Sequence, residues 1–190
     1  MAVNGWARVT AFDLDAVSIQ EARDAFPEVR FYACGVADAP VLVPGKFDLI
    51  YLFNAFYAFP NQAGALHALR ALASASARLV IFDYVDHGGF ADSPLVRLPE
   101  AGHWRPVQEI RLREQMAAVG WKLEAVRSLD ADYARWYRAL LARFDMRREA
   151  LEAIAPPEAI DHTRRFFEEV LRTIEADILG GGIFIARAAE

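Results

Sequence analysis

The chain has 190 residues, of which 55% are hydrophobic and 25% charged, so its composition excludes a disordered chain and predicts one globular domain with a sizeable core. A net charge of −5 argues against binding to nucleic acid through phosphate contacts, and a single cysteine excludes a disulfide framework or a zinc site built from several thiolates. The most apolar stretch, Leu49–Phe59, is too short to span a bilayer, and the first residues do not resemble a secretory signal, so a cytoplasmic protein is expected.

The first part of the chain alternates between strand-like and helix-like patterns. Strands are expected at 7–12, 29–34, 47–53 and 78–85, helices at 17–26 and 61–76, and a loop with two prolines at 35–46. The run at 47–53 is almost continuously apolar, which is typical of a strand buried on both faces of a parallel sheet. The alternation therefore predicts an α/β fold with mostly parallel strands and flanking helices.

The pattern changes after Asp86. A long segment with three prolines precedes a helix expected at 107–119, which Gly120 ends. The remaining expected elements are a strand at 122–129, a helix that Asp130 caps and Pro156–Pro157 breaks, a helix from Pro157 to Leu179 that Gly180–Gly182 ends, and a strand at 183–186. We expect this last strand to join the sheet antiparallel near one edge.

Candidate site residues follow the expected strands. Ligands of open α/β sheets bind beyond the carboxyl ends of the strands, where this chain has Asp13, Cys34–Gly35, Phe53–Asn54 and Asp83–His87. A carboxylate such as Asp13 can accept hydrogen bonds from both hydroxyl groups of a ribose. It can instead cap the following helix, although Asp15 lies nearer to the helix start.

Four ordered stretches resemble the motifs of class I S-adenosylmethionine-dependent methyltransferases. They are VTAFDLD, VRFYACGVADAP, FDLIYLFNAFYAFPN and ARLVIFDYVD, which together cover about Val9–Asp86. The FNAFYAFPN stretch and the aromatic-rich last third are most similar to the small-molecule group that includes sarcosine and dimethylglycine methyltransferases. The resemblance implies a Rossmann-like fold, S-adenosylmethionine as methyl donor, and one domain with a donor-binding part (1–86) and a lid and acceptor-side part (87–190).

The resemblance also assigns the donor contacts. Asp13 would bind the ribose hydroxyls and Leu14 would lie against the adenine face. Gly35 and Val36 would meet the adenine edge through backbone groups, although the family usually has a carboxylate near Gly35. The methionine part of the donor would be lined by Phe53, Asn54 and Ala55.

The acceptor side carries several aromatic and histidine candidates. Tyr57, with Asn54, is expected to line the reacting site, and methyl transfer needs alignment of the reactants more than a strong base. His87 faces the substrate or is an ordinary loop histidine, and His103–Arg105 forms a lid or a surface loop. The stripe Tyr133, Trp136 and Tyr137 either walls a pocket for an ammonium group or forms the core face of its helix.

One part of the family pattern is absent. These enzymes begin with a strand and a Gly-rich loop whose N–H groups hold the amino-acid end of the donor. The first motif of this chain resembles the second strand of those enzymes. A unit of roughly 30 residues is therefore expected to be missing, which leaves unpaired edges between the strands that end at Asp13 and Asn54.

We expect a methyltransferase that acts on a small molecule, with an amine as the favoured acceptor, and no metal, nucleic acid or membrane partner. A homodimer is one option. Two other functions stay open: a remnant deficient in donor binding that serves as an interaction subunit, and another nucleotide-binding α/β protein in which Asp13 serves the ribose of NAD.

Overall fold

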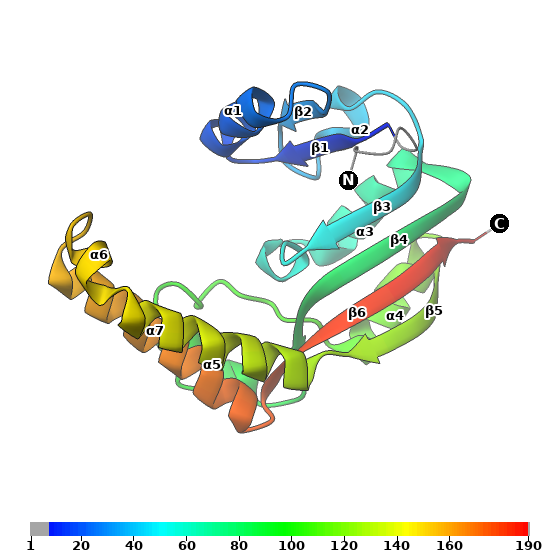
Figure 1. The fold of residues 1–190 in the computed structure, drawn as a ribbon. Helices are drawn as coiled ribbons and strands as arrows, with labels where there is room; N and C mark the ends of the chain where they lie inside the picture. The colour runs from blue at the N-terminus through cyan, green and yellow to red at the C-terminus, as the bar shows by residue number, and fades with distance from the viewer. Residues whose placement is uncertain (1–7, 190) are drawn as a thin grey trace.

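The computed structural model describes residues 8–189 and arranges their strands in two sheets (Figure 1). The small sheet consists of β1 (Thr10–Asp13) and β2 (Arg30–Ala33), which run parallel. The larger sheet has the order β3 (Phe47–Phe53), β4 (Ala73–Asp86), β6 (Leu179–Ala188) and β5 (Trp121–Ser128). Strands β3 and β4 are parallel, while β6 runs antiparallel to both of its neighbours, β4 and β5. The expected α/β fold and the expected antiparallel last strand are confirmed.

The helices lie on both sheets and beyond one end of the larger sheet. α1 (Ala16–Ala25) follows β1, α2 (Ala39–Leu42) and α3 (Gln62–Leu72) flank β3 in the chain, and α4 (Glu109–Ala118) precedes β5. The last helices are α5 (Asp130–Met146), α6 (Arg148–Glu152) and α7 (Pro157–Glu175), which extend as an arm from the larger sheet (Figure 1). Within residues 8–189, no helix is long and apolar enough to cross a membrane.

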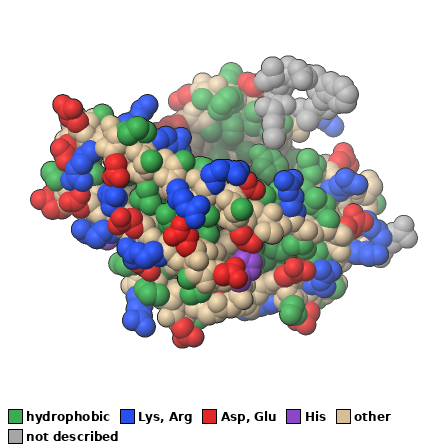
Figure 2. Space-filling view, turned by 60° about the horizontal axis from the view of Figure 1, so that its bottom comes forward, with side chains coloured by type: hydrophobic (Ala, Val, Ile, Leu, Met, Phe, Trp, Pro, Cys, Tyr) green, Lys and Arg blue, Asp and Glu red, His purple; other side chains and the backbone are tan. Residues whose placement is uncertain are grey.

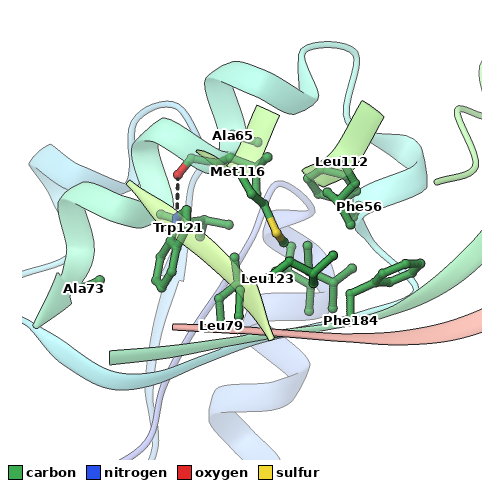
Figure 3. Packing of buried hydrophobic residues seen from close by; sticks show 14 of the residues in the cluster. Phe56, Ala65, Ala73, Leu79, Leu112, Met116, Trp121, Leu123 and Phe184 are labelled. Atoms are coloured by element: carbon green, nitrogen blue, oxygen red, sulfur yellow. Dashed lines mark hydrogen bonds between the residues drawn. The ribbon is translucent and has the colours of Figure 1, made fainter. Parts of the chain in front are cut away.

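The main core lies on the face of the larger sheet that α3 and α4 cover. Successive residues of a strand point to opposite faces, so residues in register form rows across the sheet. One such row contains Leu52, Ile81 and Phe184, all buried. Leu112 and Met116 of α4 pack onto this face with Trp121, whose Nε1–H donates to the carbonyl of Leu66 at 3.2 Å (Figure 3).

The opposite face of the larger sheet is partly open. Its rows are Tyr51–Val80–Ile185 and Phe53–Phe82–Ile183. The Tyr51 and Phe53 side chains are 55% and 64% exposed, and hydrophobic side chains are visible in a recess of the surface (Figure 2). Parallel strands are normally covered on both faces, so this apolar surface is unusual.

Side-chain packing, and not strand pairing, joins the small sheet to the larger one. Cys34, Ala39, Val43 and Leu72 form a buried cluster at this junction. β1 and β3 point the same way (Figure 1), and within residues 8–189 neither has a partner along its second edge. The expected break between the strands that end at Asp13 and Asn54 is confirmed.

The first elements form close to their expected bounds. β3 has the bounds predicted, while the strand expected at 7–12 is β1, and Ala7 lies outside the described residues. The loop expected at 35–46 contains the single turn α2, whose first turn accommodates Pro40. The helix expected at 61–76 ends at Leu72 because Ala73 pairs with Phe47 and begins β4.

The second half of the chain requires three corrections. The helix that follows Leu129 is divided into α5 and α6, and Asp130 is its first residue and not its cap. The helix expected to reach Leu179 ends at Glu175, and Asp177, with a φ of 57°, follows it. Gly180–Gly182 therefore lie inside β6 and do not end a helix.

Candidate functional site

The carboxylate of Asp13 lies exposed where β1 and β2 end side by side. The Cys34 N–H donates to the Asp13 carbonyl at 2.9 Å, which fixes the two strand ends together. Asp15 caps α1, because its carboxylate accepts from the Val17 N–H and the Ser18 hydroxyl, and these bonds lower its pKa. Asp13 accepts only the Asp15 N–H, through Oδ1 at 2.9 Å, among the described residues. Its second oxygen is available to a ligand.

The other predicted adenine contacts lie beside Asp13. Leu14 is 80% exposed, and a Cβ added to Gly35 would lie 3.8 Å from the Leu14 side chain and 3.8 Å from Oδ2 of Asp38. Val36 is half-buried and packs against the main core. Sequence reasoning missed Asp38, which supplies a carboxylate close to Gly35, three residues further along the chain.

The turn that follows β3 has a constrained backbone. Asn54 has a φ of 45°, in the left-handed region, and its N–H donates to the Phe82 carbonyl at 2.8 Å. The Tyr133 hydroxyl donates to Oδ1 of Asn54 at 2.7 Å, and the ring of Phe53 stacks on Phe82 with centroids 4.6 Å apart. Tyr133, from the second half of the chain, therefore contacts Asn54, and a covering role for the segment after Asp86 stays a prediction.

A buried carboxylate organises this turn. Oδ2 of Asp83 accepts hydrogen bonds from the N–H groups of Ala55, Phe56 and Tyr57, at 3.2, 2.7 and 3.3 Å. Oδ1 accepts the Tyr84 N–H at 2.7 Å, and the whole residue is inaccessible to solvent. Burial raises the pKa of Asp83 to about 6, although the four N–H donors act in the opposite direction. The available sequence signal was an acidic residue inside an apolar strand, where an ionised group needs partners.

An aromatic cluster packs behind the turn. The ring of Tyr57 lies 5.1 Å from Tyr84 and 4.8 Å from Trp104, between ring centroids, and Tyr84 stacks on Trp104 at 4.8 Å. Tyr133 and Tyr137 are buried in the same cluster, whereas Trp136 is 51% exposed. Tyr133 and Tyr137 thus form a core face of α5, and the Trp104 side chain packs into the same core, while His103 and Arg105 on either side of it are exposed.

His87 lies apart from the turn. Its Nε2 is 3.0 Å from Oδ1 of Asp130, and its backbone N–H donates to the Ile178 carbonyl. His87 follows Phe82 by five residues along β4, and at about 3.3 Å per residue this places it roughly 16 Å beyond the end of β3. Partial burial raises the pKa of Asp130, but bonds from Ser128 and His87 outweigh this and lower it overall. The structure does not bring His87 to Asn54, and a catalytic role for His87 stays a prediction.

The glycines of β6 provide space for these side chains. A Cβ at Gly180 would overlap Asp130 and His87, and one at Gly181 would overlap the ring of Tyr133.

Replacing Gly181 with alanine should displace Tyr133 from Asn54 and lower the free energy of unfolding by about 1–3 kcal/mol, the usual cost of overpacking. Urea unfolding measures this effect. The control is Gly35→Ala, whose added Cβ has only ordinary contacts; equal stability of the two variants would contradict the prediction.

The raised pKa of Asp83 makes stability depend on pH. Its pKa rises from the ordinary 3.8 to about 6 in the folded protein, which therefore binds more protons than the unfolded chain between these values. The free energy of unfolding should fall by about 3 kcal/mol from this group as the pH rises from 3 to 7. Unfolding at several pH values should show a flatter profile for Asp83→Asn; identical profiles for both proteins would refute this assignment.

The predicted donor residues thus form two groups at the same edge of the fold. Asp13, Leu14, Gly35 and Val36 lie at the end of the small sheet, while Phe53 and Asn54 end β3. Exposed apolar side chains beside a free carboxylate oxygen fit the adenosine half of S-adenosylmethionine. Among the described residues, no loop between β1 and β3 offers backbone N–H groups to the amino-acid end of S-adenosylmethionine. No cluster of three or more metal-ligating side chains occurs in this part of the chain.

Comparisons with known proteins agree with this arrangement. Residues 1–81 match a family described as a methyltransferase domain, whereas no curated protein matches the sequence. A candidate sarcosine dimethylglycine methyltransferase from Galdieria sulphuraria is 14% identical, with a TM-score of 0.85 over 95% of this chain and 68% of its own. A cyclopropane synthase from Mycobacterium tuberculosis, also 14% identical, gives 0.83 over 95% and 70%.

A third similar structure is phosphoethanolamine N-methyltransferase 2 from Haemonchus contortus, in complex with S-adenosyl-L-methionine. It is 15% identical and gives a TM-score of 0.79 over 96% of this chain and 44% of its own. At these identities the likeness shows the fold. The sequence match to the methyltransferase-domain family covers residues 1–81. The structural likeness covers 95% of the chain and shows the Rossmann-like fold of class I S-adenosylmethionine-dependent methyltransferases.

Proposed function

We propose that this protein transfers a methyl group from S-adenosylmethionine to a small molecule, with an amine as acceptor. The observation that carries the proposal is the turn Asn54–Tyr57, which Asp83 and Tyr133 fix at the strand edge that also bears Asp13. The support from the comparisons is that similar structures contain S-adenosylmethionine or its product. An amine is favoured because one neighbour is described as a sarcosine dimethylglycine methyltransferase and another as a phosphoethanolamine N-methyltransferase.

The donor would lie across the ends of β1, β2 and β3. Asp13 would hold the ribose hydroxyls through its free oxygen, and Leu14 would cover one face of the adenine. Phe53 and Asn54 would line the methionine part. Bound S-adenosylmethionine supplies a methyl group on a positively charged sulfur, an activated leaving group that needs no acid catalyst.

The protein's own contribution is alignment and the exclusion of water. Burial, and secondarily the negative charge of Asp83, raise the pKa of Tyr57, so its hydroxyl stays protonated at neutral pH. Tyr57 can therefore orient an acceptor through a hydrogen bond but does not remove a proton from it. Tyr84 and Trp104 pack against the ring of Tyr57, so an acceptor held by the Tyr57 hydroxyl would lie beside a buried aromatic cluster, and this would favour the neutral amine, whose lone pair is the nucleophile, over the ammonium ion.

A methyl-transfer assay tests this proposal. Labelled S-adenosylmethionine is incubated with sarcosine, dimethylglycine or phosphoethanolamine and with the protein extended at its N-terminus by the first strand, Gly-rich loop and helix of a structural neighbour. We expect Tyr57→Phe to lower kcat about tenfold, since one orienting hydrogen bond contributes about 1 kcal/mol or slightly more. Tyr51→Phe, on the open face of β3, is the control and should retain full activity. Transfer to none of the acceptors by a protein shown to bind the donor would reject the amine acceptor.

A second function is favoured by the open sheet face. Tyr51, Phe53 and the unpaired edge of β3 would suit contact with another polypeptide, either a partner or a second copy of this chain. This is the interaction-subunit alternative. Sedimentation velocity over a range of concentrations tests self-association, and a Tyr51→Lys, Phe53→Lys variant should abolish any dimer that uses this face.

A further inference from the structure

We infer that Tyr133 is a positioning residue, which holds the Asn54 carboxamide so that its nitrogen Nδ2 donates a hydrogen bond to the carboxylate of the methyl donor. The inference rests on the proposed function, because it assigns one further contact at the proposed donor site. It concerns the amino-acid end of S-adenosylmethionine, to which the described residues offer no loop of backbone N–H groups between β1 and β3.

The backbone of Asn54 is held by β4. Its φ of 45° lies in the left-handed region, which asparagine adopts more readily than most residues that have a Cβ. The Asn54 N–H donates to the Phe82 carbonyl at 2.8 Å, and the next N–H, of Ala55, donates to the buried Asp83 at 3.2 Å. The Asn54 side chain therefore extends from a backbone with little freedom to move.

The ring of Tyr133 is held by β6. A Cβ at Gly181 would lie only 2.3 Å from this ring, so the buried ring packs directly on the bare backbone of the strand. The Leu129 N–H donates to the Gly181 carbonyl at 2.8 Å, and Oδ1 of Asp130 accepts the Gly181 N–H at 3.0 Å. These bonds tie the start of α5 to β6, and the Tyr133 hydroxyl is thereby kept beside Asn54.

The hydrogen bond between these two residues fixes the orientation of the carboxamide. The Tyr133 hydroxyl donates to Oδ1 of Asn54 at 2.7 Å. Burial, and secondarily the charge of Asp83, raise the pKa of Tyr133, so the hydroxyl keeps its proton and can donate. With the carboxamide turned over, Nδ2 would donate to the hydroxyl oxygen, and the buried hydroxyl hydrogen would have no acceptor within residues 8–189. Only the first orientation satisfies both groups.

This orientation leaves Nδ2 of Asn54 available to a ligand. Asn54 is half-buried, and among the described residues its Nδ2 has no hydrogen-bond partner but is not buried, so it is open to solvent. An amide nitrogen carries two N–H donors and cannot accept. It therefore binds a carboxylate, through a bond that the ligand's charge strengthens, and not an ammonium group. Of the two charged groups at the amino-acid end of the donor, Asn54 thus selects the carboxylate.

Calorimetric titration of the N-terminally extended protein with two ligands tests the inference. S-adenosylhomocysteine carries the amino-acid end, and 5′-methylthioadenosine lacks it. Asn54→Asp keeps the size of the side chain, tolerates the left-handed backbone and still accepts the Tyr133 hydroxyl, but it replaces Nδ2 with a negatively charged oxygen. It should weaken binding of S-adenosylhomocysteine about tenfold or more, through repulsion between like charges, and change binding of 5′-methylthioadenosine less than about twofold.

Tyr133→Phe should weaken binding of S-adenosylhomocysteine about fivefold, because the carboxamide is no longer held in one orientation, and should leave binding of 5′-methylthioadenosine unchanged. Tyr137→Phe is the matched control. Tyr137 lies in the same helix and the same buried cluster, but its hydroxyl bonds to that of Tyr84 and not to Asn54. This variant should bind both ligands like the unaltered protein.

The outcomes separate this inference from the proposed function. Tighter binding of S-adenosylhomocysteine by Asn54→Asp would show that Asn54 faces the ammonium group, and equal losses for the two ligands would show a structural role alone. Equal binding by Tyr133→Phe and Tyr137→Phe would show that Tyr133 does not position the carboxamide. Each of these results overturns the inference and leaves the proposed donor standing. Binding of neither ligand by the folded, unaltered extended protein would reject the donor and this inference with it.

Discussion

Replacing Asp83 with alanine is expected to lower the free energy of unfolding by about 4 kcal/mol or more and to remove any methyl-transfer activity. The carboxylate accepts four backbone N–H groups, and its loss leaves these donors buried without partners, at a cost of about 1–3 kcal/mol for each. Release of the unfavourable burial of the charge offsets part of this cost. The turn Asn54–Tyr57 would then lose the group that fixes it.

Urea unfolding and the methyl-transfer assay measure these two effects. Asp48→Ala is the matched control, because Asp48 is also an aspartate beside β4 but is exposed, and among residues 8–189 it accepts only the Ser74 hydroxyl, at 2.8 Å. It should change stability by less than about 1 kcal/mol. An Asp83→Ala protein as stable as the Asp48→Ala protein would show that the turn does not depend on this carboxylate.

Residues 1–190 are expected to bind S-adenosylhomocysteine weakly or not at all, and a protein extended at its N-terminus should bind it strongly. Asp13 can contribute a charged hydrogen bond to the ribose, but the described residues leave the amino-acid end without N–H donors between β1 and β3. Two or three missing contacts of about 1 kcal/mol each weaken binding by roughly 30- to 150-fold. Calorimetric titration of both proteins measures the difference.

The extension consists of the first strand, Gly-rich loop and helix of a structural neighbour, fused ahead of residue 1. Asp13→Ala should abolish binding to the extended protein, whereas Asp24→Ala, on the exposed surface of α1, should not. Micromolar binding by the unextended chain, lost in Asp13→Ala, would show that the fold compensates for the open edges. No binding by a folded extended protein would refute the proposed donor.

The hydrophobic pattern of the sequence predicted correctly those strands and helices whose structure depends mainly on their own residues. β3 is apolar throughout, and its bounds were predicted correctly. The glycines of β6 were assigned to a helix end because glycine is common there, whereas their actual role depends on Asp130 and Tyr133, about 50 residues earlier in the chain. No local pattern contains that information.

The same distinction holds for the candidate site. Asp13, Gly35 and Asn54 were found because they end strands, and strand ends are recognisable in the sequence. Asp83 was seen only as part of a strand end, since its four N–H partners become apparent when β3 and β4 are paired. The separation of His87 from Asn54 follows from the register of the two strands, in which Phe53 at the end of β3 pairs with Phe82, and the apolar pattern of either strand does not give that register.

The junction between the two sheets contains the chain's only cysteine, which makes it a chemical reporter of their separation. Cys34 is 6% exposed, packs with Ala39, Val43 and Leu72, and has a pKa that burial raises. An alkylating reagent would reach this thiol only when the small sheet detaches from α3. The labelling rate of the native protein therefore gives the frequency of that opening, without any introduced probe, and a ligand that bridges β1 and β3 would slow it.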